Sequence, residues 1–175
     1  IYCASNMNDV LTRFIASGTL EPKETMPTVA PSMDIQIPSS LERLIYDLEG
    51  DTSSFYNQLQ NEKVATLSED ATKKLQSIFS SKSFDDEMIL REIKDFNKNY
   101  DWIVDPHTAT AVSEKVTFSS NLPVVGVATA SPEKFSNVIS SVISSFSVKN
   151  SENTEDYIVC RSDSSTVENA INEYF

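Results

Sequence analysis

The stretch Leu122 to Phe135, LPVVGVATASPEKF, joins an apolar run to the beginning of a helix. The valine-rich half is typical of a buried strand, and Ser131 followed by Pro132 is typical of a helix N-terminus. Apolar residues then recur at helical spacing as far as Phe146. This is the clearest strand-to-helix unit in the chain, and it leaves Thr129 as an isolated hydroxyl between the strand and the helix.

The first part of the chain repeats the arrangement. Residues 1–5, IYCAS, are a predicted strand, and an amphipathic helix follows from residue 10 until Gly18 ends it. Prolines interrupt residues 20–38, which predicts an extended connection. Ser39 with Glu42 then forms a predicted capping box for a helix that Gly50 ends.

The last part of the chain contains further units of the same kind. The runs 102–104, WIV, and 156–162, DYIVCRS, are predicted strands. Asp105 with Pro106 begins a helix after the first run, and Ser165 with Glu168 forms a capping box after the second. Apolar strands that alternate with helices predict an α/β fold with a largely parallel sheet covered on both faces.

Residues 51–100 contain three helical patterns, with six of the ten lysines and nine of the 26 acidic residues of the chain. The predicted division of the chain is therefore an α/β domain from residues 1–50 and 101–175, with a solvated helical insertion between them. No chemistry is predicted for the insertion.

Composition excludes several classes of protein. The 175 residues carry a formal net charge of −12, which disfavours binding to nucleic acid or to an anionic membrane surface. No apolar run is long enough to span a membrane. The two cysteines, Cys3 and Cys160, lie in apolar runs without metal-ligand spacing, so we expect buried thiols in a reducing compartment, the cytoplasm, with a disulfide as the alternative. Because Ile1 lies in a strand-like run, we also expect a fragment of a longer protein.

Ligands of α/β proteins gather where strands end and helices begin. Asn8, Asp105 and Ser131 stand at such junctions, and helix capping alone explains each of them. Thr129 is not at a cap, so its hydroxyl is either bonded to neighbouring backbone or available to a ligand nitrogen. His107 is the only histidine, which excludes a two-histidine metal site within this chain and leaves it a structural residue or a base. With three glycines, the chain has no glycine-rich phosphate loop.

Several segments in fixed order resemble the carboxy-terminal part of threonine synthases of the long fungal and bacterial type. They are CASNMNDVLTRFIASG (3–18), PSMDIQIPSSLERLIYDLEG (31–50), DPHTATAV (105–112) and VVGVATASPEKF (124–135). The resemblance implies part of a three-layer αβα sandwich of the tryptophan-synthase β type, fold type II of the pyridoxal-phosphate enzymes. It also implies the conversion of O-phosphohomoserine and water to threonine and phosphate.

The resemblance also implies site residues. Thr129 matches the residue that hydrogen-bonds the pyridine nitrogen of the cofactor, a neutral partner that does not force that nitrogen to stay protonated. The other matched residues are expected near the cofactor cleft, with no catalytic step assigned: Asn6, Asn8, Asp9, Arg13, Ser32, Met33, Asp34 and His107.

The sequence departs from the family in two respects. Ser131 and Glu133 replace a histidine and a small residue, and Thr110 and Ala111 replace valine and glycine. The Schiff-base lysine and the phosphate loop are expected upstream, in a missing amino-terminal part of the protein, so we predict that this chain alone is inactive. Two alternatives stay open: a threonine synthase-like phospholyase, and a non-catalytic α/β module that retains the fold.

Overall fold

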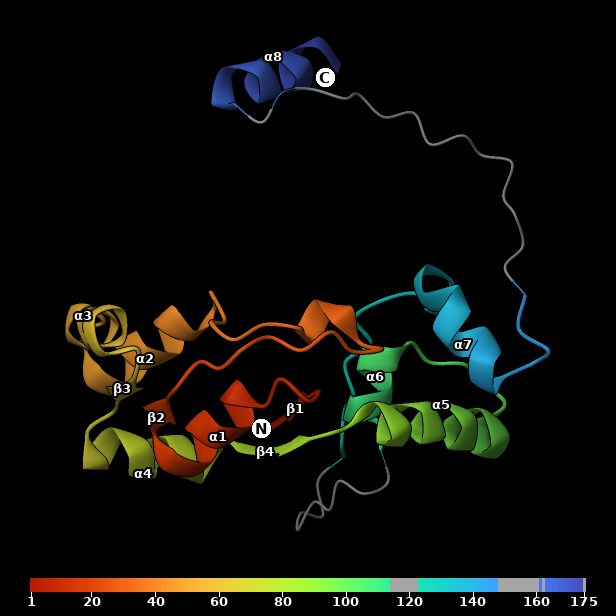
Figure 1. Ribbon diagram of the computed structural model, residues 1–175, viewed down its shortest axis with the longest axis horizontal. Helices are drawn as coiled ribbons and strands as arrows, with labels where there is room; N and C mark the ends of the chain where they lie inside the picture. The colour runs from red at the N-terminus through yellow and green to blue at the C-terminus, as the bar shows by residue number, and fades with distance from the viewer. Residues whose placement is uncertain (114–122, 148–160, 162, 175) are drawn as a thin grey trace.

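A parallel pair of strands forms the centre of the computed structural model, which describes residues 1–113, 123–147, 161 and 163–174 (Figure 1). Strand β1 (Tyr2–Ser5) pairs with β4 (Ser80–Ser83), so that Tyr2 lies opposite Ser80 and Ser5 opposite Ser83. The predicted strand at residues 1–5 is thus confirmed. Strand β4 was not predicted, because its sequence, SSKS, lacks the apolar character that marks a strand.

Helix α1 (Val10–Ser17) returns from the end of β1 and packs its apolar face inward. Gly18 ends it as predicted: the residue has φ +73°, and its N–H donates to the carbonyl of Phe14 at 2.7 Å. A side chain at Gly18 would also collide with Thr72, since a Cβ there would lie 2.2 Å from the Thr72 hydroxyl oxygen. Both the backbone conformation and the space therefore require glycine at this position.

Two groups of buried side chains form the core. The first joins α1 to α2 (Leu41–Glu49), α3 (Ser53–Glu62) and α4 (Glu69–Ile78), with Phe14 packed edge-on against Phe55 at 6.1 Å between ring centroids. A short antiparallel pair, β2 (Thr19–Leu20) and β3 (Ala65–Thr66), lies beside these helices. This half of the molecule buries the apolar faces that the sequence predicted for residues 10–18, 41–48 and 71–79.

The second core group lies at the other end of the molecule, as Figure 1 shows. It joins α5 (Asp86–Tyr100), α6 (Pro106–Ala111) and α7 (Ser136–Val142), with Ile89, Ile93 and Ile139 fully buried. Short 3₁₀ turns at Pro31–Met33 and Pro132–Phe135 and a final helix, α8 (Ser164–Tyr174), complete the described elements. In the described parts of the chain no helix is both long and apolar enough to cross a membrane.

Two of the strands predicted for the last part of the chain do not form in the structure. Residues 123–130 and 102–104 belong to no strand in the structure, so both predictions are wrong as sheet assignments. The physical reason is pairing, because an apolar run becomes a strand only where a neighbouring backbone accepts and donates its hydrogen bonds. Residue 122, most of the predicted strand at 156–162 and Cys160 lie outside the described residues.

The predicted helix caps are partly confirmed. Asp105 and Ser131 cap their helices, and Gly50 ends α2 with φ +78°. The capping box at Ser39 is wrong: α2 begins after Ser40, and the structure shows no side-chain cap there. Helix α8 also differs, since the carboxylate of Asp163, rather than Ser165, accepts the N–H of Thr166 at 2.9 Å.

The segment 51–100 contributes more than helices. It supplies β3 to one pair of strands and β4 to the other, and β4 lies directly beside β1. The division of the chain at residues 50 and 101 stays a prediction, to which the structure adds this connection through the sheet.

Candidate functional site

A buried network of polar side chains fixes the loop of residues 26–36 against the end of β1. Asn6 is fully buried, and its amide nitrogen lies 2.7 Å from both the hydroxyl of Thr28 and a carboxylate oxygen of Asp34. The amide of Asn8 donates to the same Asp34 oxygen at 3.0 Å and to the carbonyl of Met26 at 2.8 Å. The hydroxyl and the N–H of Thr28 also donate to Asp34, at 2.8 and 3.1 Å.

This network is satisfied internally. The carboxylate of Asp34 accepts from Asn6, Asn8 and Thr28, and the carbonyl oxygen of Asn6 accepts the N–H of Asn8 at 2.8 Å. Asp34 is half-buried, so its carboxylate depends on these donors in place of part of its water. Asn8 therefore does not cap α1. The network instead acts as a clamp that holds the residues after β1 against the loop of residues 26–36.

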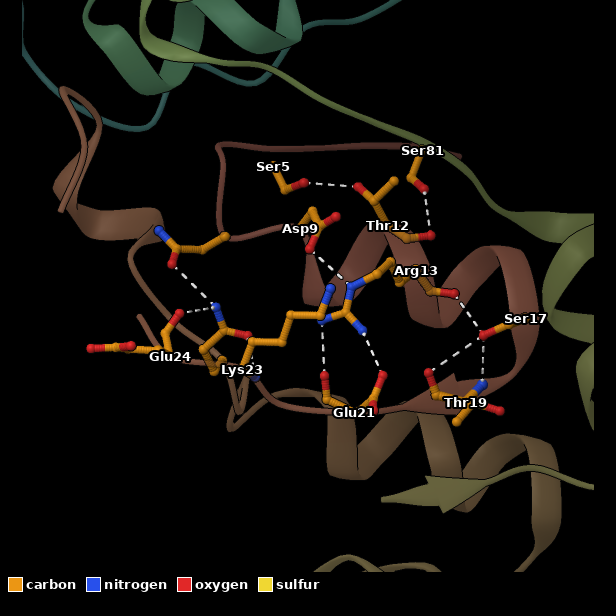
Figure 2. A network of polar contacts seen from close by, with 12 residues as sticks. Ser5, Asp9, Thr12, Arg13, Ser17, Thr19, Glu21, Lys23, Glu24 and Ser81 are labelled. Atoms are coloured by element: carbon orange, nitrogen blue, oxygen red, sulfur yellow. Dashed lines mark hydrogen bonds and ion pairs between the residues drawn. The ribbon is translucent and has the colours of Figure 1, made fainter. Parts of the chain in front are cut away.

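Arg13 lies in a separate, more exposed network along α1. Figure 2 shows its guanidinium between the carboxylate of Asp9, at 2.9 Å, and Glu21, whose carbonyl accepts at 2.8 Å. The hydroxyls of Ser5 and Thr12 also share a hydrogen bond, at 2.8 Å. Arg13 and Asp9 thus neutralise each other within one turn of the helix.

Asp105 is the centre of a second buried network, at the N-terminus of α6. Its side chain accepts the N–H of His107 at 2.9 Å and approaches the His107 ring nitrogen Nδ1 to 2.7 Å. The hydroxyl of Thr108 donates to the other carboxylate oxygen. Asp105 is 1% exposed, so the helix N-terminus and these donors together replace the water that a carboxylate needs.

The contacts of His107 define its tautomer. Its Nε2 accepts the backbone N–H of Ser32 at 3.0 Å, so Nε2 carries no proton. Nδ1 therefore carries the proton and donates it to Asp105. The ring also packs edge-on against Phe135, with 4.8 Å between ring centroids, and the His107 carbonyl accepts the hydroxyl of Thr110 at 2.8 Å. Of the two interpretations of His107, this geometry favours the structural one.

A cavity of about 380 Å³ is lined by residues of β1, the 3₁₀ turn Pro31–Met33, α6 and the extended segment 123–130. Ser32 and Thr129 line it, and neither hydroxyl makes a hydrogen bond with the part of the chain that the structure describes. The backbone N–H of Thr129 is bonded, to the hydroxyl of Thr108 at 3.3 Å. The remaining lining is largely apolar and comes from Ala4, Met33, His107, Thr110, Ala111, Val127 and Ala130.

An apolar cavity of about 310 Å³ lies next to the first one. Residues 126–129 of the extended segment separate them: Val127 and Thr129 line the first cavity, whereas Gly126 and Ala128 line the second; Ala130 lines both. This alternation is that of a β-strand, whose successive side chains point to opposite faces. The segment thus has the side-chain pattern of the predicted strand without its sheet.

The structure divides the predicted site residues into two groups. Four of them line the same cavity: Ser32, Met33, His107 and Thr129. The others lie in the networks of Asp34 and Arg13 and do not line it: Asn6, Asn8, Asp9, Arg13 and Asp34. Sequence reasoning missed Thr28 and Thr108, and only the spacing of Thr108 from the cap residue Asp105 could have indicated its role.

No group of three or more histidine, cysteine or carboxylate side chains among the described residues could hold a metal ion. In β1, burial raises the pKa of the Cys3 thiol above its ordinary value. The described part of the chain therefore offers hydroxyls, rather than metal ligands or an activated thiol, to a ligand.

No protein-family model matches the chain. The threonine synthase of Pseudomonas aeruginosa is 32% identical in an alignment of 143 residues that covers 78% of this chain and 30% of that protein. Threonine synthase-like 1 of Macaca fascicularis is 30% identical over 165 residues, covering 90% of this chain and 22% of that protein. The chain spans less than a third of the length of each of these relatives.

The structure is also similar to solved enzymes. The crystal structure of pyridoxal-phosphate-bound threonine synthase from Brucella melitensis matches 81% of this chain and 32% of that chain, with a TM-score of 0.76 and 31% identity. The resemblance drawn from the motifs is thereby confirmed, as is the α/β fold class.

Proposed function

We propose that this chain, a homologue of threonine synthases over most of its own length, is part of an enzyme that converts O-phosphohomoserine and water to threonine and phosphate. The observation that carries the proposal is the cavity at which all four motifs meet. Ala4 comes from the first motif, Ser32 and Met33 from the second, His107 from the third and Thr129 from the fourth. Residues that are far apart in the sequence thus line one cavity.

The cavity suits pyridoxal phosphate. Its lining is mostly apolar, as a flat aromatic ring requires, and the hydroxyl of Thr129 is left without a partner in the described chain. We assign Thr129 to the pyridine nitrogen, to which a hydroxyl donates a hydrogen bond without imposing a charge. When bound, the cofactor supplies an electron sink for negative charge at the substrate carbon. The chain's own part is to hold and orient the ring.

The covalent attachment must come from elsewhere. None of the described residues that line the cavity is a lysine, and an amine is needed to hold the cofactor and to move protons at the substrate. We assign the Schiff-base lysine and the phosphate loop to a part of the protein outside this chain, so the chain alone is inactive. We also assign the reaction to the cytoplasm, a reducing compartment in which the thiols of Cys3 and Cys160 stay unpaired.

An absorbance spectrum tests this proposal. The complete protein and the 175-residue chain are each mixed with pyridoxal phosphate, and spectra are taken before and after addition of borohydride. We expect a reducible chromophore in the complete protein only, and release of phosphate and threonine from O-phosphohomoserine. The absence of a chromophore in both would overturn the enzyme proposal and favour a non-catalytic module.

A second candidate is a threonine synthase-like phospholyase. It is supported by the match to threonine synthase-like 1, which covers 90% of this chain. The product distinguishes the two. Threonine from O-phosphohomoserine supports a synthase, whereas 2-oxobutyrate supports the phospholyase.

A further inference from the structure

Ser32 and Thr129, whose hydroxyls have no partner among the described residues, are both held in place by side chains of α6. Both residues belong to irregular segments, the 3₁₀ turn Pro31–Met33 and the extended segment 123–130. Neither segment is fixed by a sheet. Each is fixed instead by its backbone N–H, which donates to a side chain of α6.

The first connection runs through His107. Asp105 accepts Nδ1–H of the imidazole at 2.7 Å, and Nε2 on the opposite side of the ring accepts the N–H of Ser32 at 3.0 Å. The ring is 7% exposed and also packs against Phe135, so its orientation is fixed. Asp105 thereby determines both the tautomer of His107 and the position of Ser32.

The second connection runs through Thr108. Its hydroxyl donates its single proton to the other oxygen of Asp105, so its lone pairs are left to accept the N–H of Thr129 at 3.3 Å. Thr108 is 3% exposed and Asp105 is 1% exposed. The two oxygens of one buried carboxylate thus orient two acceptors, and each acceptor holds one wall of the cavity.

From this geometry we infer that Asp105 is a positioning residue: through His107 and Thr108 it places the hydroxyls of Ser32 and Thr129 against the molecule that the cavity binds. His107 then acts as a spacer of fixed tautomer and transfers no proton. Ser32 contacts the bound molecule, as Thr129 does. Only the identity of that molecule, pyridoxal phosphate, rests on the proposed function.

The test combines hydrogen exchange with single-connection variants of the complete protein. Exchange at the amides of Ser32 and Thr129 is followed by mass spectrometry with residue resolution. In His107→Asn, the shorter amide still reaches Asp105 but not Ser32, so we expect exchange to rise about 10-fold at Ser32 and not at Thr129, the size of one lost hydrogen bond. Thr108→Val removes the hydroxyl at nearly constant volume, and we expect the opposite pattern. Asp105→Asn accelerates both.

Conservative variants provide the matched controls. His107→Gln retains an acceptor near the position of Nε2, and Thr108→Ser retains the hydroxyl. We expect each to restore slow exchange at its own amide, which a general loss of stability would not do. The inference is overturned if His107→Asn and Thr108→Val accelerate both amides equally, or if neither amide responds. Should Asp105→Asn not fold, these two variants still decide.

Cofactor binding is the second measurement. Titration with pyridoxal phosphate, followed by fluorescence, gives the dissociation constant of each variant. We expect Ser32→Ala to weaken binding about 3-fold to 10-fold, the range of one hydrogen bond, while exchange at its backbone amide stays slow. An unchanged dissociation constant in Ser32→Ala would overturn the contact assigned to Ser32. If the wild-type protein binds no pyridoxal phosphate but the exchange pattern holds, the proposed function fails and the role of Asp105 stands.

Discussion

The two junctions that contribute to the candidate site differ in the burial and hydrogen bonding of their polar side chains. At the end of β1, Asn6 and Asn8 are buried and hydrogen-bonded to Asp34, and none of the three lines the cavity. At the end of the extended segment, Thr129 is exposed, lines the cavity, and has an unpartnered hydroxyl among the described residues. Motif residues at a junction therefore serve two purposes. Satisfied groups hold the walls in place, and open groups are left for a ligand.

The largest effect on stability is expected at the end of β1, where the polar side chains are hydrogen-bonded to one another. Asp34→Ala removes a carboxylate that accepts hydrogen bonds from Asn6, Asn8 and Thr28. Buried donors without acceptors cost about 1–3 kcal/mol each, so we expect the free energy of unfolding to fall by about 2–4 kcal/mol. Urea denaturation followed by far-UV circular dichroism measures this change.

Glu69→Ala is the matched control for Asp34→Ala. It also removes a carboxylate, but one that pairs with Lys73 on the surface of α4 and is 83% exposed. The free energy of unfolding should change by less than about 0.5 kcal/mol. Equal effects of the two substitutions would contradict the clamp function of Asp34.

The next effect is expected at the open junction, and in binding rather than stability. Thr129→Val keeps the shape of the side chain and removes the hydroxyl, so we expect affinity for pyridoxal phosphate to fall about 10-fold, the size of one hydrogen bond to a polar ring atom. Because that hydroxyl has no partner in the described chain, the free energy of unfolding should stay within about 0.5 kcal/mol. Thr129→Ser, which keeps the hydroxyl, should bind nearly as the wild type. A loss of stability without a loss of affinity would make Thr129 a structural residue.

The same contrast explains how much of the fold could be predicted from the sequence. Apolar spacing and glycine located α1 and its end at Gly18, because the same side chains that repeat in sequence are those buried in the core. Strand β4 was missed because its side chains are serine and lysine, and its place in the sheet depends on β1, about 80 positions earlier in the sequence. The segment 123–130 was assigned to a sheet because its composition is that of a strand, but pairing depends on a second backbone, of which composition says nothing.

The candidate site shows a similar division. The motif resemblance predicted that Ser32, Met33, His107 and Thr129 lie near one cleft, and in the structure they line one cavity. It could not separate them from Asn6 or Asp34, because motif residues that hold a wall and motif residues that face a ligand are equally polar. The residues that line the cavity, and the free hydroxyls among them, become known only from the structure. The role of Thr108 was likewise hidden, since a threonine in the first turn of a helix has an ordinary explanation as part of the cap.

Valine substitutions extend the comparison to apolar side chains. Val10, in α1, is 1% exposed, whereas Val125, in the extended segment, is 83% exposed. Val10→Thr buries a hydroxyl and should lower the free energy of unfolding by about 1–3 kcal/mol, whereas Val125→Thr should change it by less than about 0.5 kcal/mol in this chain. Urea denaturation of both variants measures the difference. A cost at Val125 equal to that at Val10 would mean that residues 123–130 are covered by other parts of the chain.

The smallest effect concerns Cys3, which lies in β1 and packs against the first core group. Burial raises the pKa of its thiol above 9.0, because the thiolate is less well solvated there than in water. The folded protein then binds the proton more tightly than the unfolded chain, so this contribution to stability is complete below the unfolded pKa and is lost as the pH rises through the folded pKa. We expect iodoacetamide to label Cys3 more slowly in the folded protein than in urea at pH 8, as followed by peptide mass spectrometry. Cys3→Ala should accordingly lose less stability than the wild type between pH 7 and alkaline pH. Equal labelling rates in the folded and unfolded protein would contradict the burial of Cys3 in β1. They would show that its thiol is as open to solvent as Thr129 is.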